Sequence, residues 1–267
     1  MYDFNYFRPN DLASAEGFLK AEDAKLLAGG QTLIPTLKQR LAAPKHVVDL
    51  AAVAGLTGIE RKGRNVVIGA MTRHADVATS AVVHKAIPAL AALAGEIGDP
   101  AVRNRGTIGG SIANNDPSAD YPAACLALGA TIITNKREIP ADEFFTGLFE
   151  TALEDGEIVT QVCFPVPVKA AYAKFPNPAS RYALVGVFVM KDGKGVRVAV
   201  TGAGEGGVFR VSAMERALTK KFVAKSLEGI KIEPGNLIAD IHGSADYRAH
   251  LIGVMARRAV DAAASTK

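Results

Sequence analysis

The pattern of apolar and polar positions over the first fifty residues alternates between helix and strand. In chain order it predicts a helix over 12–20 capped by Asn10 or Asp11, a strand over 25–28, a helix over 32–42 and a strand over 46–50. In the second helix, leucines at every fourth position would share one face: Leu33, Leu37 and Leu41. This order predicts a small βαβ unit, with Gly29–Gly30–Gln31 as the turn from strand to helix.

Beyond residue 56 the pattern changes to short β-branched segments separated by alanine-rich helices. The predicted elements are strands over 65–69, 131–134 and 157–164, a helix over 87–97, and a helix that follows Pro122 and carries Cys125. Pro165 and Pro167 then interrupt the pattern and predict a boundary.

The last hundred residues add a third group of elements. They are strands over 183–191 and 196–201, a helix that opens at Ser212 with a capping box over 212–215, and a terminal helix over 247–264. The predicted fold class is therefore α+β, with three small subdomains over 1–53, 54–165 and 166–267.

The composition is that of a globular chain. Its 267 residues correspond to one or two domains at roughly 150 residues each. Hydrophobic residues make up 49% and charged residues 22%, which excludes a disordered protein. The net charge is +4, but no run of lysine and arginine is longer than two, so we expect no nucleic-acid-binding stripe.

Cysteine and histidine usage excludes several kinds of site within this chain. Cys125 and Cys163 are too few for a disulfide framework, an iron–sulfur cluster or a four-cysteine zinc site. The five histidines show no HExxH motif or close pairing, so we expect no metal centre. The N-terminus has an acid at Asp3 and no basic segment, and the longest aliphatic run, 183–190, is far shorter than the roughly 18 residues that span a bilayer. We therefore expect a soluble, cytoplasmic chain.

Two glycine-rich segments have the composition of anion-binding loops. In 26–35 a strand runs into two glycines and a helix begins at Thr32, so free N–H groups would favour an anion. An ordinary βα turn would show the same pattern. In 102–122, three glycines stand among small hydroxyl residues just after Arg103 and Arg105, which suits a diphosphate.

A third segment matches the dinucleotide fingerprint in spacing only. Gly202, Gly204 and Gly207 read G-x-G-x-x-G after the predicted strand 196–201. That fingerprint requires the glycines to open directly into a helix, whereas here they run into the strand-like stretch 208–211. A strand–turn–strand hairpin is the favoured interpretation, and a nicotinamide site is the alternative.

Other catalytic chemistry is not apparent in the sequence. It contains no nucleophile elbow, Walker A motif or kinase motif set. Asp116 and Asp120 are predicted to lie in a loop without a partner that would mark an acid–base pair. A chain with anion-binding loops and no catalytic set of its own indicates a bound cofactor that supplies the chemistry.

Four stretches together form a specific pattern: AGGQTLIPTLKQRL (28–41), IGAMTRHADV (68–77), RNRGTIGGSIANNDPSADYPAACLALGA (103–130) and AYAKFPNPASRYALVGV (171–187). They resemble the FAD-binding, or medium, subunit of the molybdenum hydroxylases, which include aerobic carbon monoxide dehydrogenase and the flavin portion of xanthine dehydrogenase. The resemblance covers essentially the whole chain, and PASRYA looks closest to the carbon monoxide dehydrogenase group.

The resemblance implies an FAD-binding fold of the vanillyl-alcohol-oxidase type, with the C-terminal subdomain closing over FAD held between the other two. The two diphosphate loops would be Ala28, Gly29, Gly30, Gln31 and Thr32, and Thr107, Ile108, Gly109, Gly110 and Ser111. Asp120 would match the acid that hydrogen-bonds the cofactor, Lys174 the lysine near the isoalloxazine, and Tyr182 an aromatic residue at the ring. As alternatives, Lys174 reads as a solvated strand residue and Tyr182 as a core tyrosine.

The resemblance also implies the mode of attachment and the partners. Some relatives in the wider fold attach the flavin through a histidine in the first loop, whereas Gln31 cannot form that bond, so FAD would be held noncovalently. A large subunit would carry the molybdenum–pterin centre and a small subunit two [2Fe–2S] clusters, in a dimer of heterotrimers. This chain would take electrons from the clusters and pass them to an external acceptor. It would oxidise no substrate alone.

Two other functions stay open from the sequence. One is a stand-alone nicotinamide-dependent oxidoreductase that uses the 202–207 glycines. The other is a non-enzymatic interaction subunit that has kept the fold and lost the flavin.

Overall fold

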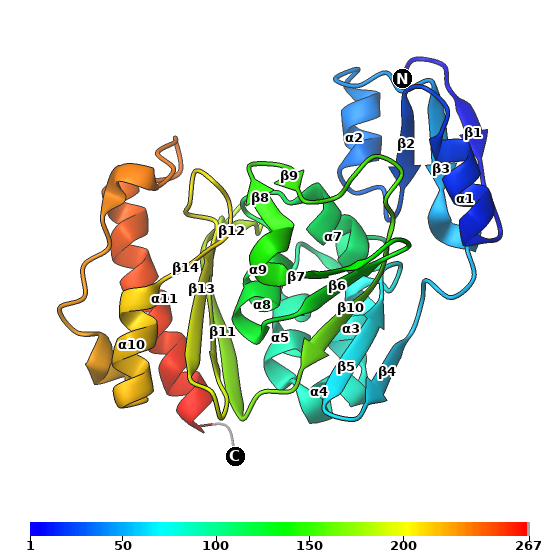
Figure 1. Ribbon diagram of the computed structural model, residues 1–267. Coiled ribbons are helices and arrows are strands. Elements are labelled where there is room, and N and C mark those ends of the chain that lie inside the picture. The colour runs from blue at the N-terminus through cyan, green and yellow to red at the C-terminus, as the bar shows by residue number, and fades with distance from the viewer. Residues whose placement is uncertain (266–267) are drawn as a thin grey trace.

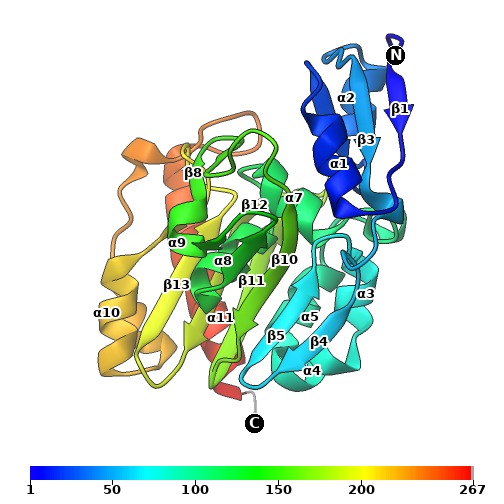
Figure 2. The ribbon, with the colours of Figure 1, turned by 45° about the vertical axis from the view of Figure 1, so that its right-hand side comes forward.

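The computed structural model describes residues 1–265 as three main sheets with their helices, arranged side by side, and one small two-stranded sheet (Figure 1). One main sheet lies in each of the three predicted ranges, and the two-stranded sheet lies in the central range. The N-terminal subdomain stands beside the central sheet, and the turned view shows its helices and strands separated from the remainder (Figure 2). The α+β class is confirmed, whereas the division into subdomains at these boundaries stays a prediction.

The N-terminal sheet is parallel, with strand order β1-β3-β2. Its elements are β1 (Asn5–Phe7), α1 (Leu12–Leu19), β2 (Ala24–Leu27), α2 (Leu33–Lys38), β3 (His46–Asp49) and the short 3-10 helix η1 (Leu50–Ala52). The side chain of Asp11 accepts a 2.8 Å hydrogen bond from the Ser14 N–H, so the predicted cap is confirmed. The predicted βαβ unit is present as β2, α2 and β3, and β1 adds a third strand that the sequence pattern did not indicate.

Helix α2 is shorter than predicted. The helix expected over 32–42 ends at Lys38, because Arg40 takes a left-handed conformation at φ 59° and turns the chain. Leu37 is buried, but Leu41 lies beyond the helix and is 74% exposed. The expected leucine face is therefore wrong at its last position.

The central sheet is antiparallel, with strand order β4-β5-β10-β6-β7 and helices packed on one face (Figures 1 and 2). Its strands are β4 (Ile59–Lys62), β5 (Asn65–Gly69), β6 (Thr131–Thr134), β7 (Glu138–Pro140) and β10 (Val159–Pro165). The helices and the small β8–β9 hairpin are α3 (His74–Thr79), α4 (Ala81–Ala86), α5 (Pro88–Gly95), α6 (Pro100–Arg103), α7 (Ile108–Asn114), α8 (Tyr121–Leu128), α9 (Ala141–Phe144), β8 (Phe145–Gly147) and β9 (Glu150–Thr151).

The C-terminal sheet is antiparallel, with order β11-β12-β13-β14, and lies between two layers of helices. Its elements are β11 (Lys169–Pro176), β12 (Ala183–Lys191), β13 (Val196–Thr201), β14 (Phe209–Arg210), α10 (Ser212–Lys220), α11 (Ala245–Ser265) and the short 3-10 helices η2 (Ala224–Leu227) and η3 (Pro234–Asn236). Helix α11 packs on one face of β11 and β12, and α5 and α8 pack on the other. Because both faces are covered, β12 is buried from Ala183 to Met190, which explains its unbroken apolar run.

The expected capping box at the start of α10 is wrong. No side chain caps this helix, and Val211 occupies the capping position. The Glu215 carboxylate instead accepts a hydrogen bond from the Val198 N–H at 3.0 Å and pairs with the Arg210 guanidinium at 2.8 Å. Glu215 therefore bonds α10 to the neighbouring sheet instead of capping the helix.

The N-terminal subdomain contacts the central one through both apolar and polar side chains. Ile158 packs into its core against Val48, Leu50 and Leu56. Beside it, the Asn135 amide donates to the Glu16 carboxylate of α1 at 2.9 Å. This contact fixes how the two subdomains face each other.

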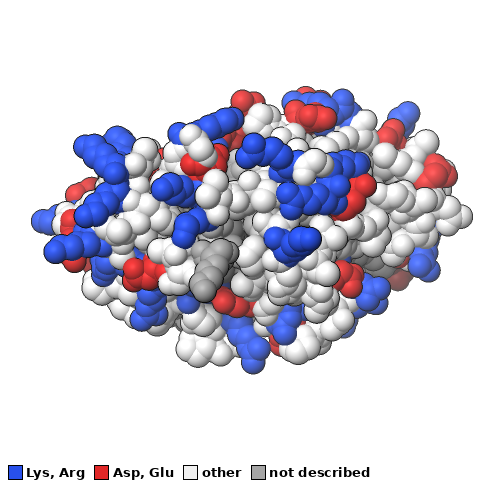
Figure 3. Space-filling model, turned by 90° about the horizontal axis from the view of Figure 1, so that it is seen from below, with Lys and Arg blue, Asp and Glu red and all other residues white. Residues whose placement is uncertain are grey.

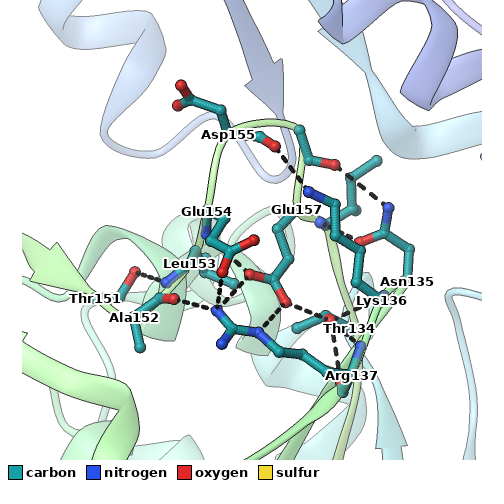
Figure 4. A network of polar contacts seen from close by, with 12 residues as sticks. Thr134, Asn135, Lys136, Arg137, Thr151, Ala152, Leu153, Glu154, Asp155 and Glu157 are labelled. Atoms are coloured by element: carbon teal, nitrogen blue, oxygen red, sulfur yellow. Dashed lines mark hydrogen bonds and ion pairs between the residues drawn. The ribbon is translucent and has the colours of Figure 1, made fainter.

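A polar network supports the turn that carries Asn135 (Figure 4). The Glu157 carboxylate accepts hydrogen bonds from Arg137 at 3.0 Å, from the Thr134 hydroxyl at 2.7 Å and from the Glu154 N–H at 2.9 Å. The side chain of Glu157 is fully buried. Its hydrogen bonds with Arg137 lower its pKa to about 2.

The basic side chains do not form a continuous stripe on the face opposite the N-terminal subdomain. In the view from below, lysine and arginine are separated by acidic and uncharged side chains (Figure 3). Within residues 1–265 no helix is both long and apolar enough to cross a bilayer.

Candidate cofactor site

A cavity of about 690 Å³ lies between the N-terminal and central subdomains and extends to the C-terminal one. Its volume is within the usual range for small-molecule and cofactor sites. Its wall includes all but two of the predicted site residues, namely Ala28, Gly29, Gly30, Gln31, Thr32, Thr107, Gly109, Gly110, Ser111, Asp120 and Tyr182. Ile108 is instead fully buried in the central core, and Lys174 lies behind the wall.

The first glycine segment follows β2 and packs directly against the second. A Cβ on Gly29 would collide with the carbonyl oxygen of Arg105 and lie 2.6 Å from the Gly106 Cα. Gly30 has φ 73°, a conformation that L side chains rarely adopt. Within residues 1–265, no backbone hydrogen bond uses the N–H of Gln31 or Thr32. These two donors are therefore available to a ligand at the cavity wall.

The second glycine segment is the start of a helix, and its description as a loop is wrong. Thr107 caps α7, and its hydroxyl accepts from the Gly110 N–H at 3.2 Å. The segment 70–74 holds this turn through backbone hydrogen bonds, from Ile108 to Thr72 at 3.1 Å and from Gly109 to Ala70 at 2.8 Å.

Protein contacts account for two of the glycines expected at the diphosphate. A Cβ on Gly109 would lie 2.5 Å from the Cβ of Ala70, and Gly29 meets the second segment in the same way. At these positions glycine is required by the approach of two protein segments. Gly110 is different, because a Cβ there would meet only Thr107 Oγ1 at 3.0 Å and the Ala28 Cβ at 3.2 Å while it lines the cavity.

Asp120 is not an isolated loop acid, as the sequence pattern suggested. It directly precedes α8, and its carboxylate accepts hydrogen bonds from the Tyr172 hydroxyl at 2.5 Å and from the Lys174 ammonium at 3.0 Å. The interpretation of Lys174 as a solvated residue is wrong, because its side chain is 1% exposed. Burial raises the pKa of Asp120, and the charge of Lys174 opposes that rise.

Two further residues of the site were missed from the sequence, Tyr172 behind the wall and His74 in it. Tyr172 lies two positions before Lys174 on β11, so the two side chains share one face, and that spacing could have indicated it. His74 begins α3, and its ring Nδ1 is buried without a hydrogen-bond partner within residues 1–265. Burial, with a contribution from the charge of Arg103, lowers the pKa of His74 to about 4, so its ring is neutral at physiological pH.

Tyr182 stands at the C-terminal end of the cavity. It is 48% exposed, so the alternative of a core tyrosine is wrong, and it shares this end of the wall with Asp116. Burial raises the pKa of both groups. Asp120, Asp116 and Tyr182 therefore place hydrogen-bonding groups at one end of an otherwise largely uncharged cavity.

The third glycine motif connects two antiparallel strands. β13 pairs with β14 through Val200 and Phe209, and α10 begins only at Ser212. The glycines therefore do not open into a helix, and the geometry of a dinucleotide-binding βα turn is absent from this segment. The hairpin interpretation is confirmed.

We predict that Gly204→Ala lowers stability by about 1–3 kcal/mol through overpacking. Positive φ values occur at Gly202 and Gly207, whereas at Gly204 a Cβ would lie 2.5 Å from the Gly207 carbonyl oxygen and 2.8 Å from the Phe209 ring. Chemical denaturation measures the change, with Gly206→Ala as the control because its Cβ would meet nothing within 4 Å. Loss of nicotinamide binding at unchanged stability would contradict the hairpin interpretation.

Comparison with known proteins identifies the family. Residues 2–167 match the family described as the FAD binding domain in molybdopterin dehydrogenase. The chain belongs to this family. The matched residues contain both glycine segments, Asp120 and the central sheet.

Curated relatives and a solved structure extend the similarity over the whole chain. The carbon monoxide dehydrogenase medium chain of Hydrogenophaga pseudoflava is 35% identical and aligns over 97% of this chain and 96% of its own. The nicotine 6-hydroxylase medium subunit of Paenarthrobacter nicotinovorans is 37% identical over 96% and 95%. A structure of carbon monoxide dehydrogenase from Hydrogenophaga pseudoflava superposes with a TM-score of 0.89 at 37% identity, covering 98% of this chain and 97% of that one. The FAD-binding fold expected from the sequence is confirmed.

Proposed function

We propose that this chain is the FAD-carrying electron-transfer subunit of a molybdenum-containing hydroxylase. The observation that carries the proposal is the cavity at which two glycine segments, far apart in sequence, meet between subdomains. Membership in the FAD-binding family of molybdopterin dehydrogenases indicates which cofactor binds. The relatives named medium chain or medium subunit indicate the role of the chain in a larger enzyme.

The residues of the cavity fit FAD. The N–H groups of Gln31 and Thr32 and the hydroxyl groups of Thr107 and Ser111 would hold the diphosphate, because they are donors in the cavity wall. The N–H groups of Ile108, Gly109 and Gly110 in the first turn of α7 bond to protein acceptors instead. Asp120 and Tyr182 would face the isoalloxazine end. FAD, when bound, supplies the capacity to accept electrons from a donor and pass them to an acceptor. This chain binds and orients the cofactor and shields it from water.

Noncovalent attachment agrees with the contents of the cavity. The first segment offers Gln31, and the histidine in the wall, His74, lies against Gly106, where its Nε2 would be 2.5 Å from an added Cβ. The His74 ring is thus packed by protein. We propose that FAD is held by hydrogen bonds and packing alone.

The partners proposed are a large molybdenum-binding subunit and a small iron–sulfur subunit, in a dimer of heterotrimers in the cytoplasm. In support, Cys125 is buried, Cys163 is half-buried, and within residues 1–265 no group of three or more His, Cys, Asp or Glu could hold a metal. Substrate oxidation and the metal clusters then belong to other chains. The substrate contacts lie there as well.

The experiment that tests this function compares the chain alone with the chain purified alongside its partners. We expect a flavin absorption spectrum from the chain in the complex, and turnover of a reduced substrate only when the partners are present. Turnover by the isolated chain would contradict the assignment. A complex that is active without flavin would favour a non-enzymatic interaction subunit, and flavin-free nicotinamide-dependent activity would favour the stand-alone oxidoreductase.

A further inference from the structure

A buried ion pair stands directly behind the isoalloxazine end of the cavity. The side chain of Asp120 is 5% exposed and that of Lys174 is 1% exposed. The Lys174 ammonium donates to Asp120 Oδ2 at 3.0 Å and to the Glu96 carbonyl at 3.1 Å, and it forms an ion pair with Asp120 Oδ1 at 3.0 Å. These contacts hold the ammonium behind Asp120, outside the lining of the cavity.

Tyr172 completes the arrangement from the same strand face. Its hydroxyl donates to Asp120 Oδ1, the second interaction of that oxygen. The hydroxyl passes over Gly186 of β12, where a Cβ would collide with it. Gly186 pairs with Lys174 in the sheet, so a glycine stands in a strand interior at the one place where Tyr172 must pass. Three elements, β11, β12 and the start of α8, thus converge on one carboxylate.

The charges of Asp120 and Lys174 act on a ligand bound in the cavity. The charges of Asp120 and Lys174 cancel in sum. Because both groups are buried, a change in either charge acts on a neighbouring charge more strongly than it would at the surface. Reduction of FAD adds electrons, and thus negative charge, to the ring. An uncompensated carboxylate beside the ring would oppose that charge, and an uncompensated ammonium would favour it.

We propose that Tyr172 and Lys174 are positioning residues that set the reduction potential of the bound FAD by balancing the charge of Asp120 at the cavity wall. The proposal rests on the proposed function, since it requires FAD in this cavity with its ring at the Asp120 end. Neither residue touches the cavity directly, and both act by orienting and neutralising one carboxylate.

The test measures the two-electron potential of FAD in the full chain purified with its partners, by spectroelectrochemistry at alkaline pH so that Asp120 keeps its charge. Lys174→Gln is expected to make the potential more negative, and Asp120→Asn to make it more positive. Tyr172→Phe should give a smaller negative shift, because it removes one hydrogen bond and no charge. Lys194→Gln, in the exposed turn between β12 and β13, removes the same charge far from the cavity and should leave the potential unchanged.

Further measurements separate this inference from the proposed function. FAD content is determined first, and a parent protein without FAD would refute the proposed function rather than the charge balance. Gly186→Ala should reproduce the shift of Tyr172→Phe without altering a polar group, and these two variants decide the matter if the charge variants fold without FAD. Equal potentials in the parent and the variants that hold FAD, or shifts of one sign for Lys174→Gln and Asp120→Asn, would overturn the proposal.

Discussion

A valine at position 110 is expected to give a folded chain that binds no FAD. The first added carbon already lies 3.0 Å from Thr107 Oγ1 and 3.2 Å from the Ala28 Cβ, so the two methyl groups must enter the cavity or push the glycine segments apart. Each charge-assisted hydrogen bond lost at the diphosphate weakens binding by about 1.5–3 kcal/mol, so two lost bonds reduce affinity by roughly two to four powers of ten. The ratio of FAD to protein after purification measures the loss.

A matched variant separates binding from folding. Gly17 lies in exposed α1, where an added Cβ would meet nothing within 4 Å, so Gly17→Val should keep its flavin. The far-ultraviolet circular dichroism of both variants should equal that of the parent. Full flavin occupancy in Gly110→Val would refute the assignment of this segment to the diphosphate. In the parent, acid precipitation should release the flavin into solution, and colour that stays in the pellet would show a covalent bond.

Arg137→Met is expected to lower the free energy of unfolding. It would leave the buried Glu157 carboxylate without its guanidinium partner, and a buried charge that loses its partner is destabilising. The loss should be smaller than for a fully buried pair, because the Arg137 side chain is 42% exposed. Denaturant unfolding measures it, with Arg64→Met on the exposed turn after β4 as the control. An equal loss in both variants would contradict the special role of Arg137.

The Arg137–Glu157 ion pair also predicts how the free energy of unfolding depends on pH. The pKa of Glu157 is lowered from 4.5 to about 2 in the folded chain, so its contribution is complete above pH 4.5 and is lost as the pH falls toward 2. In Arg137→Met the free energy of unfolding should depend less on pH in this range, because without Arg137 the pKa of Glu157 is lowered less in the folded chain. Unfolding curves across that window decide the point. An unchanged slope would assign the acid sensitivity to other groups.

The sequence pattern was most reliable where one rule governs a whole element. The strands over 65–69, 183–191 and 196–201 are present with their predicted bounds. In β12 the reason is that helices cover both faces, so the strand is apolar from Ala183 to Met190. Each of the three predicted ranges contains one main sheet, and the central range also contains the β8–β9 hairpin. Local composition sufficed for these strands and for the two glycine segments, whereas Asp120 and Tyr182, which also line the cavity, came from the family resemblance.

Features that depend on contacts between distant segments could not be predicted in this way. The reason for glycine at position 29 is the carbonyl of Arg105, and the reason at position 186 is the hydroxyl of Tyr172. The capping box failed because Glu215 found stronger partners on the neighbouring sheet, Arg210 and the Val198 N–H. A single sequence contains no record of which residues will meet across such separations.

The seating of the N-terminal subdomain has a consequence for how the protein is made. Glu16 and Asn135 are 119 residues apart, and the cavity wall extends from Lys25 to Tyr182. During synthesis a chain that has not yet passed residue 182 has no complete cavity, and β11 and β12 are covered only when α11 has formed. Such non-local closure is also slow compared with local helix formation. We therefore expect flavin uptake to follow translation, so that FAD supply in the cell limits how much finished chain matures rather than how fast it is synthesised.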